Sequence, residues 1–187
     1  MWPGPTYFPD WFAPNTSSWW MDEFSRFKDI VNYDGIWIDM NEVANFCNLD
    51  GTDQVCSLDP ENSCPDNECC LICDTVDPTN EYDFPPFVPH VFFGSLGGKT
   101  VSMNSYHHGD ILEYNSHSLF GFMESIATNN AVATITGERP FILSRSTFMG
   151  SGKYTAHWTV SNSKFAIASM NSCYCTVQFI NLPCCTI

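Results

Sequence analysis

The chain has 187 residues, of which 44% are hydrophobic and 15% aromatic, a composition sufficient for a packed core. Its 21 acidic residues outnumber its 7 basic ones, which gives a net charge of -14 and leaves no basic stripe. Such a chain repels phosphate backbones, so we expect no nucleic-acid partner. It also contains no run of about 18 apolar residues, so we expect no membrane span.

The first predicted element is a helix at residues 17–32, which follows a loop rich in Pro, Gly and aromatic residues. Apolar side chains recur in it at helical spacing and form one face: Trp20, Phe24, Phe27 and Val31. A short apolar strand follows at 35–39. A helix that leads directly into a strand is typical of an α/β protein.

This strand ends at Asp39, and a second carboxylate follows at Glu42. An acid at the end of a buried strand costs about 2–7 kcal/mol unless it is paired or used. In parallel barrels, this end of the strands carries the catalytic residues. Asp39 is therefore the first candidate functional residue.

Residues 43–105 have weak periodicity, and we interpret them as a long insertion near the site. Six of the ten cysteines lie in it: Cys47, Cys56, Cys64, Cys69, Cys70 and Cys73. The spacing does not fit a standard zinc site on the last three, so we favour disulfides of unknown pairing. We also expect His107 and His108, near Asp110, to be solvated rather than metal-binding, and predict no metal site.

A second helix is expected at 115–131, with Glu124 off an apolar side formed by Leu119, Phe122, Met123 and Ile126. Two further strands are predicted, one at 140–144 that leads into Arg145 and one at 155–159. This alternation of strands and helices predicts a parallel sheet with helical crossovers.

The segment 160–187 differs from the rest of the chain. It contains no acidic residue, one basic residue and four cysteines, whereas all 21 acids precede it. We expect it to be a divergent tail. The amino-terminal residues lack the pattern of a signal peptide, so any such signal lies upstream. The sequon that begins at Asn15 is consistent with a secretory route.

Five blocks, in this order, resemble glycoside hydrolase family 31, the α-glucosidase family: MWPGPTYFPDWFAP, GIWIDMNEVANFC, EYDFPPFVP, LEYNSHSLFGFMESIA and ERPFILSRSTFMGSGKYTAHWT. The resemblance covers residues 1–159. It implies an α/β fold, a partial (β/α)8 TIM barrel with about strands 4 to 6 and the cysteine-rich insertion. It also implies a cofactor-independent hydrolase that releases terminal α-linked glucose from oligosaccharides, in the secretory pathway or outside the cell.

The resemblance implies that Asp39 is the nucleophile of a retaining mechanism. One carboxylate attacks the anomeric carbon, and a second carboxyl group about 5–5.5 Å away protonates the leaving oxygen. Glu42 either supports the loop and a neighbouring arginine or takes part in catalysis. Trp37 and Met40 either line the sugar subsite or pack in the core.

Arg145 matches the substrate-binding arginine of the family, since its planar fork of donors can hold sugar hydroxyls and a carboxylate together. An ordinary surface salt bridge is the alternative. Trp158 matches a substrate-binding position, and we expect the neighbouring His157 to be structural.

The resemblance ends after Thr159. The family continues with Gly-Asp, and that aspartate is the general acid, but this chain has Val160 and Ser161. A serine hydroxyl is too weakly acidic to replace a group that contributes about 10²–10⁴-fold. We therefore expect the chain to be inactive by itself, with an unspliced intron as one origin of the tail. The alternative is a truncated product that binds sugar or a partner without catalysis.

Overall fold

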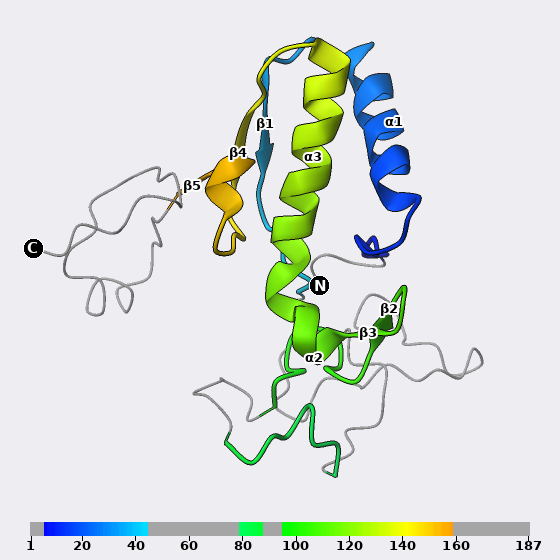
Figure 1. Ribbon diagram of the computed structural model, residues 1–187, viewed down its shortest axis with the longest axis vertical. Coiled ribbons are helices and arrows are strands. Elements are labelled where there is room, and N and C mark those ends of the chain that lie inside the picture. Colours follow the sequence, from blue (N-terminus) through cyan, green and yellow to red (C-terminus); the bar gives the residue numbers. More distant parts are fainter. Residues whose placement is uncertain (1–5, 45–78, 88–94, 159–187) are drawn as a thin grey trace, which may run out of the picture. The chain divides into compact units, whose positions relative to one another are not determined.

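The computed structural model describes residues 6–44, 79–87 and 95–158, which form two compact units (Figure 1). Of these residues, the first unit contains 6–13, 43–44, 79–87 and 95–117, and the second contains 14–42 and 118–158. The cysteines of the predicted insertion, the tail at 160–187 and Ser161 lie outside the described residues. Predictions about them therefore stay predictions.

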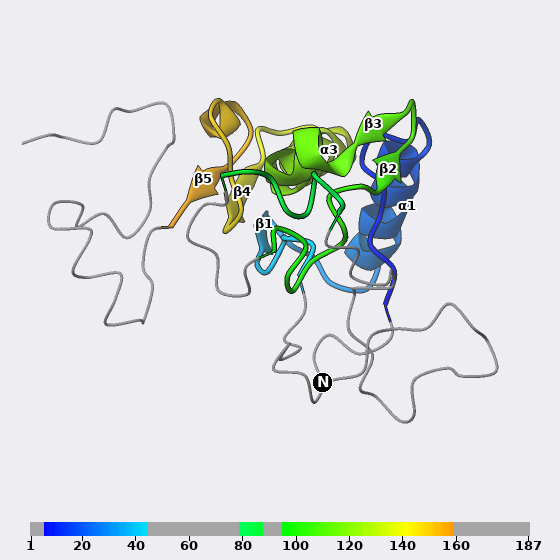
Figure 2. The same ribbon diagram turned by 90° about the horizontal axis from the view of Figure 1, so that it is seen from below.

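The second unit contains a parallel sheet with the strand order β1-β4-β5. Its strands are β1 (Gly35–Ile38), β4 (Phe141–Ser144) and β5 (Ala156–His157), and they lie side by side in both views (Figures 1 and 2). β4 pairs with β1 over its whole length and with β5 at its carboxyl half. The predicted parallel sheet is thus confirmed, with strand bounds within two residues of those expected.

Helix α1 (Thr16–Lys28) confirms the first predicted helix but ends four residues earlier than expected. The Trp20 indole N–H donates to Thr128 Oγ1 at 2.9 Å and so joins α1 to α3. Val31 lies beyond the helix and is 46% exposed. The helix end is held instead by Tyr33, whose hydroxyl donates to the Phe24 carbonyl at 3.0 Å.

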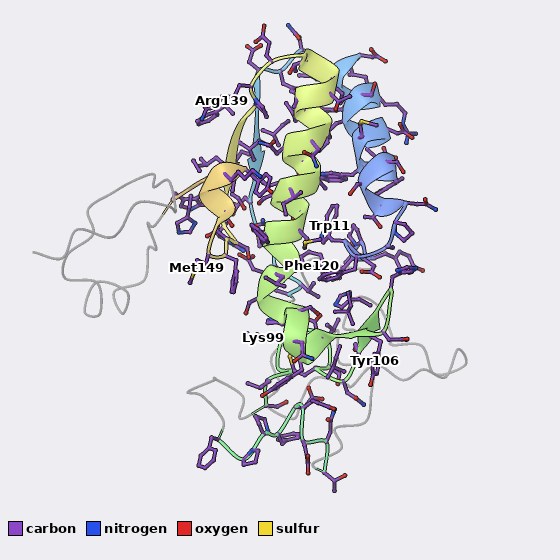
Figure 3. The ribbon with its side chains drawn as sticks, viewed as in Figure 1. Trp11, Lys99, Tyr106, Phe120, Arg139 and Met149 are labelled. Atoms are coloured by element: carbon purple, nitrogen blue, oxygen red, sulfur yellow. The ribbon has the colours of Figure 1, made fainter. Side chains whose placement is uncertain are left out.

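Helix α3 (Phe120–Thr136) follows the short 3-10 helix η2 (His117–Leu119) and packs against both α1 and β4. It ends at Gly137, whose positive φ of 69° suits a helix C-cap. Figure 3 shows its side chains, with the buried Phe120 labelled, and marks Arg139 and Met149 before and after β4.

The apolar side expected for this helix is not the most buried side of α3. Small and polar side chains form most of the buried face: Gly121, Glu124, Ser125, Ala127, Thr128, Ala131 and Val132. The side predicted to be apolar is half-buried. On it, the ring centroid of Phe122 lies 6.5 Å from that of Phe148 and 6.0 Å from that of Tyr154. Small side chains on the buried face let the helix approach its neighbours closely.

The first unit contains a short hairpin that the sequence analysis did not predict. Its antiparallel strands are β2 (Tyr106–His107) and β3 (Ile111–Leu112), followed by α2 (Glu113–Ser116). The turn uses Gly109 and Asp110, with φ values of 78° and 58°. No helix in the described parts of the chain is long and apolar enough to cross a membrane.

Candidate active site

The two parallel strands β1 and β4 bring Asp39 and Arg145 to the same edge of the sheet. Each residue directly follows the last residue of its strand. The Arg145 N–H also donates to the Ile38 carbonyl at 3.2 Å, which extends the pairing by one residue. Both side chains therefore leave the sheet at its carboxyl end, as predicted from the strand ends.

Arg145 holds both carboxylates that the sequence analysis selected. Its Nε and Nη2 donate to Glu42 at 3.1 Å and 2.6 Å, which makes this contact bidentate. Its Nη1 lies 3.5 Å from Asp39 Oδ1. The hydrogen bonds with Glu42, together with the charges of Glu42 and Asp39, raise the pKa of Arg145 above its ordinary value. Glu42 thus contacts a neighbouring arginine, one of the two roles considered for it.

All three charged side chains remain accessible. The exposed fractions are 34% for Asp39, 36% for Glu42 and 40% for Arg145. A carboxylate and a guanidinium that are close together and reachable from solvent can bind the hydroxyl groups of a polar ligand. Asp39 has the longer contact to Arg145, and its Oδ1 also accepts the Met40 N–H at 2.8 Å.

Aromatic side chains flank this edge of the sheet. Trp37, from β1, is 65% exposed, so it is not a core residue of the described chain. Its ring lies 6.0 Å from that of Trp158 in an edge-on arrangement. His157 stacks on Trp158 and its Nδ1 is 3.2 Å from Thr147 Oγ1, which is a structural environment. Met40 is half-buried, and its role as a wall of the site stays a prediction.

Sequence analysis overlooked Asn41, which lies between the two acidic residues of this loop. Its side chain is buried, with 6% of the residue exposed. It donates to Ser144 Oγ at 2.8 Å and to the Ser146 carbonyl at 3.3 Å, and accepts from the Ser146 N–H at 2.7 Å. Only its position inside the Asp-Met-Asn-Glu run could have drawn attention to it.

Glu124, which was expected to lie off the packed side of its helix, is 8% exposed. Burial, the charge of Glu42 and, in the opposite sense, a hydrogen bond with Asn41 together raise the pKa of Glu124 to about 8. Its carboxyl group is therefore neutral at neutral pH. The signal available in the sequence was a single acid within a long apolar helix.

Two other features are separate from these residues. A cavity of about 460 Å³ in the second unit is lined by residues such as Asn129, Arg139 and Tyr154, and by none of the predicted site residues. Within the described ranges, no group of three or more His, Cys, Asp and Glu side chains has the arrangement of a metal site. His107, expected to be solvated, instead contacts two carboxylates in the first unit.

Comparison with known proteins identifies the class to which this chain is similar. A family model described as "Glycosyl hydrolases family 31 TIM-barrel domain" matches residues 1–179. The chain is 46% identical over 169 residues to Alpha-xylosidase 1 of Arabidopsis thaliana, covering 87% of this chain and 18% of that protein. It is 41% identical over 159 residues to lysosomal alpha-glucosidase of Rattus norvegicus, covering 85% and 14%.

A solved structure supports the same α/β fold. The Tris-bound glucosidase II alpha subunit matches 87% of this chain and 13% of its own length, with 27% identity and a TM-score of 0.53. The chain thus spans 14% to 18% of the length of the two curated relatives described above. The activity of a whole relative cannot be transferred to it without a separate argument.

Proposed function

Because this chain belongs to glycoside hydrolase family 31, we propose that it carries the nucleophile side of a retaining α-glucosidase site. Asp39 is the nucleophile and Arg145 anchors the substrate. The observation that supports this best is their convergence at the carboxyl end of paired parallel strands, with 3.5 Å between Nη1 and Oδ1. β1, β4 and β5 are then three neighbouring strands of a partial barrel.

The proposed substrate is the terminal α-linked glucose of an oligosaccharide. Asp39 attacks the anomeric carbon, the bond to the leaving oxygen breaks, and the sugar becomes joined to the carboxylate through an ester. Arg145 can donate to sugar hydroxyls through Nη1, since Nε and Nη2 already bind Glu42. Trp37 and Trp158 offer an apolar wall to the face of the sugar ring.

The general acid is the part of this mechanism that the chain lacks. Ser161 occupies the position where the family pattern has an aspartate. Without a carboxylic acid, the leaving oxygen of a natural glycoside departs as a poorly stabilised alkoxide. The chain by itself therefore does not hydrolyse maltose, and it retains only the first chemical step for substrates whose leaving group needs no proton.

A glycosyl fluoride separates these two statements, because fluoride leaves as an anion without protonation. We expect purified chain incubated with α-glucosyl fluoride to release fluoride and to gain one hexosyl group on the peptide that contains Asp39, read by mass spectrometry. The ester accumulates because the missing acid is also the base that would activate water. Maltose incubated in parallel should yield no glucose.

Two variants control the experiment. Asp39→Asn should form no adduct, whereas Asp34→Asn, which changes an exposed acid in the preceding turn, should label like the wild type. An absent adduct, or one unaffected by Asp39→Asn, would overturn the nucleophile proposal. Glucose release from maltose would refute the proposal that the chain lacks its general acid. α-Xylosyl fluoride belongs in the same panel, because one of the relatives described above is an α-xylosidase.

Sugar binding without catalysis is the alternative function for this chain. A cooperative thermal transition that shifts with glucose, with no adduct from either fluoride, would favour it.

We also propose a secretory-pathway or extracellular location. The lysosomal α-glucosidase relative is consistent with that route, and the sequon residue Asn15 is exposed before α1. Expression in a secretory host should then give a glycosidase-sensitive mass shift that Asn15→Gln removes.

A further inference from the structure

The backbone just after Asp39 is strained. Met40 has a φ of 55°, in the left-handed region that a residue with a side chain rarely adopts. The Met40 N–H donates to Asp39 Oδ1 at 2.8 Å. A left-handed residue other than glycine costs about 1–3 kcal/mol, and it persists only where surrounding contacts determine it.

Two sets of contacts hold the turn. One is the bidentate ion pair of Glu42 with Arg145, whose side chains are 36% and 40% exposed. Exposed ion pairs contribute only about 0–1 kcal/mol, which does not offset the strain at Met40. The other is the hydrogen-bond network of Asn41, which is buried and therefore worth more per bond.

The Asn41 network is closed on itself. The Asn41 amide donates to Ser144 Oγ and accepts from the Ser146 N–H, and the Ser144 hydroxyl donates onward to the Ser146 carbonyl at 2.8 Å. The network therefore joins the turn after β1 to the loop after β4. Since Asp39 is on one side and Arg145 on the other, it fixes their separation.

We propose that Asn41 is a positioning residue, which keeps the strained turn at Met40 and thereby aims the Asp39 carboxylate at the sugar. This inference rests on the proposed function, because it assigns a role in the step that Asp39 performs. Asn41 does not touch the reacting atoms. A displacement of about 1 Å at a reacting group can lower a rate about 10²-fold, so loss of the network should be visible in kinetics.

Helix α3 supports this network from behind. Glu124, on α3, is buried beside Asn41, and its hydrogen bond with Asn41 by itself lowers the pKa of Glu124. Gly121 lies so close to Ser146 that an added Cβ would be 2.5 Å from the Ser146 Cβ. The closeness of α3 keeps Ser146 in place, which in turn keeps both of its hydrogen bonds with Asn41.

The test measures the rate of adduct formation at Asp39 with α-glucosyl fluoride over a range of concentrations. Asn41→Ala should lower the maximal rate about 10- to 100-fold with little change in the half-saturating concentration, because the site still binds sugar but misplaces the carboxylate. Asn115→Ala, an exposed asparagine in α2, serves as the matched control and should react like the wild type.

Asn41→Asp distinguishes positioning from simple loss of folding. An ionised aspartate accepts but cannot donate, whereas a protonated one has the shape of asparagine and one donor. Relative to the wild type at each pH, its rate should therefore recover as the pH falls, while that of Asn41→Ala should not. Thermal unfolding of each variant checks that the chain remains folded.

The outcomes separate the two proposals. A wild type that forms no adduct refutes the proposed function, and the positioning role falls with it. If the wild type reacts and both folded Asn41 variants react as fast as the wild type, the positioning role alone is refuted. A fall in sugar binding with an unchanged maximal rate would also refute it, because that result assigns Asn41 to the binding of substrate.

Discussion

His107 lies between two carboxylates, and this predicts that its contacts with them stabilise the first unit. Its Nδ1 is 3.1 Å from Asp10 Oδ1, and its Nε2 is 2.5 Å from Glu113 Oε2. A neutral imidazole has one N–H, so both contacts are hydrogen bonds only when both ring nitrogens carry protons. Asp10 also accepts from the His108 N–H at 2.7 Å and from the Phe12 N–H at 3.0 Å, and the His117 ring contacts Glu113 at 2.7 Å.

The perturbation that isolates this effect is His107→Asn. Asparagine can donate to only one of the two carboxylates, and the same is true of a neutral histidine. Glu113 is 1% exposed, so the loss of one of its two hydrogen-bond partners is costly. A buried group left partly unsatisfied costs about 1–3 kcal/mol, and we expect a loss of about 2 kcal/mol in the free energy of unfolding.

The pH dependence has a definite sign. Burial alone would raise the pKa of Glu113, but hydrogen bonds from His117 and His107 hold it below its ordinary value. The Glu113 carboxylate therefore stabilises the folded chain above its ordinary pKa of about 4.5, and this stabilisation is lost only as the pH falls below that value.

Urea unfolding followed by circular dichroism measures the free energy of unfolding of the variant and of the wild type. His108→Asn is the matched control, because the exposed side chain of His108 has no part in these contacts and its backbone N–H is retained. An equal cost in the control would refute the reasoning, and so would a variant as stable as the wild type.

Two further predictions concern helix α3. Since the pKa of Glu124 is about 8 in the folded chain, folding retains a proton and the free energy of unfolding falls between about pH 4.5 and pH 8. Glu124→Gln should lack most of this decline in urea titrations, and a parallel decline would contradict the assignment. Gly121→Ala should cost about 1–3 kcal/mol by forcing its Cβ into Ser146, unlike Asn130→Ala on the exposed side of the helix. Thermal melts would show no difference between these two variants if the contact with Ser146 were loose.

The sheet and its edge could be predicted because their signals are local. The apolar strands at 35–39 and 140–144 each run into a charged residue, and parallel pairing then places Asp39 and Arg145 together. The contact between Arg145 and Glu42 was one of the interpretations considered. Nothing in those strands required knowledge of distant residues, apart from the rule that alternating helices and strands form parallel sheets.

The packing of α3 could not be predicted from hydrophobicity. A periodicity argument assigns the buried face to the largest apolar side chains, whereas the structure buries Glu124, Ser125 and Thr128. Thr128 is buried because it accepts the Trp20 indole N–H. Glu124 is buried beside Asn41, and burial raises the pKa of Glu124 to about 8. Each reason depends on a partner that is distant in the sequence.

The hairpin at 106–112 is too short for periodicity to detect. Its two strands contain two residues each, and the local signal was the Gly109-Asp110 turn. The partners of His107 were less accessible still, since Asp10 is 97 residues away in the chain. A pair of adjacent histidines in a polar loop suggests solvation, and only the fold places one of them between two acids.

The charge of Glu42 acts on two neighbours, since it helps to raise the pKa of Glu124 and also raises that of Arg145. With Glu124 neutral, Arg145 remains the charged partner of Glu42. Arg145 gives two hydrogen bonds to Glu42 and only the 3.5 Å contact to Asp39. Glu42 thus occupies the strongest donors, and Asp39 is left as the less tightly bound carboxylate. A nucleophile needs this condition, because a carboxylate held by two short hydrogen bonds would have to break them before it could attack.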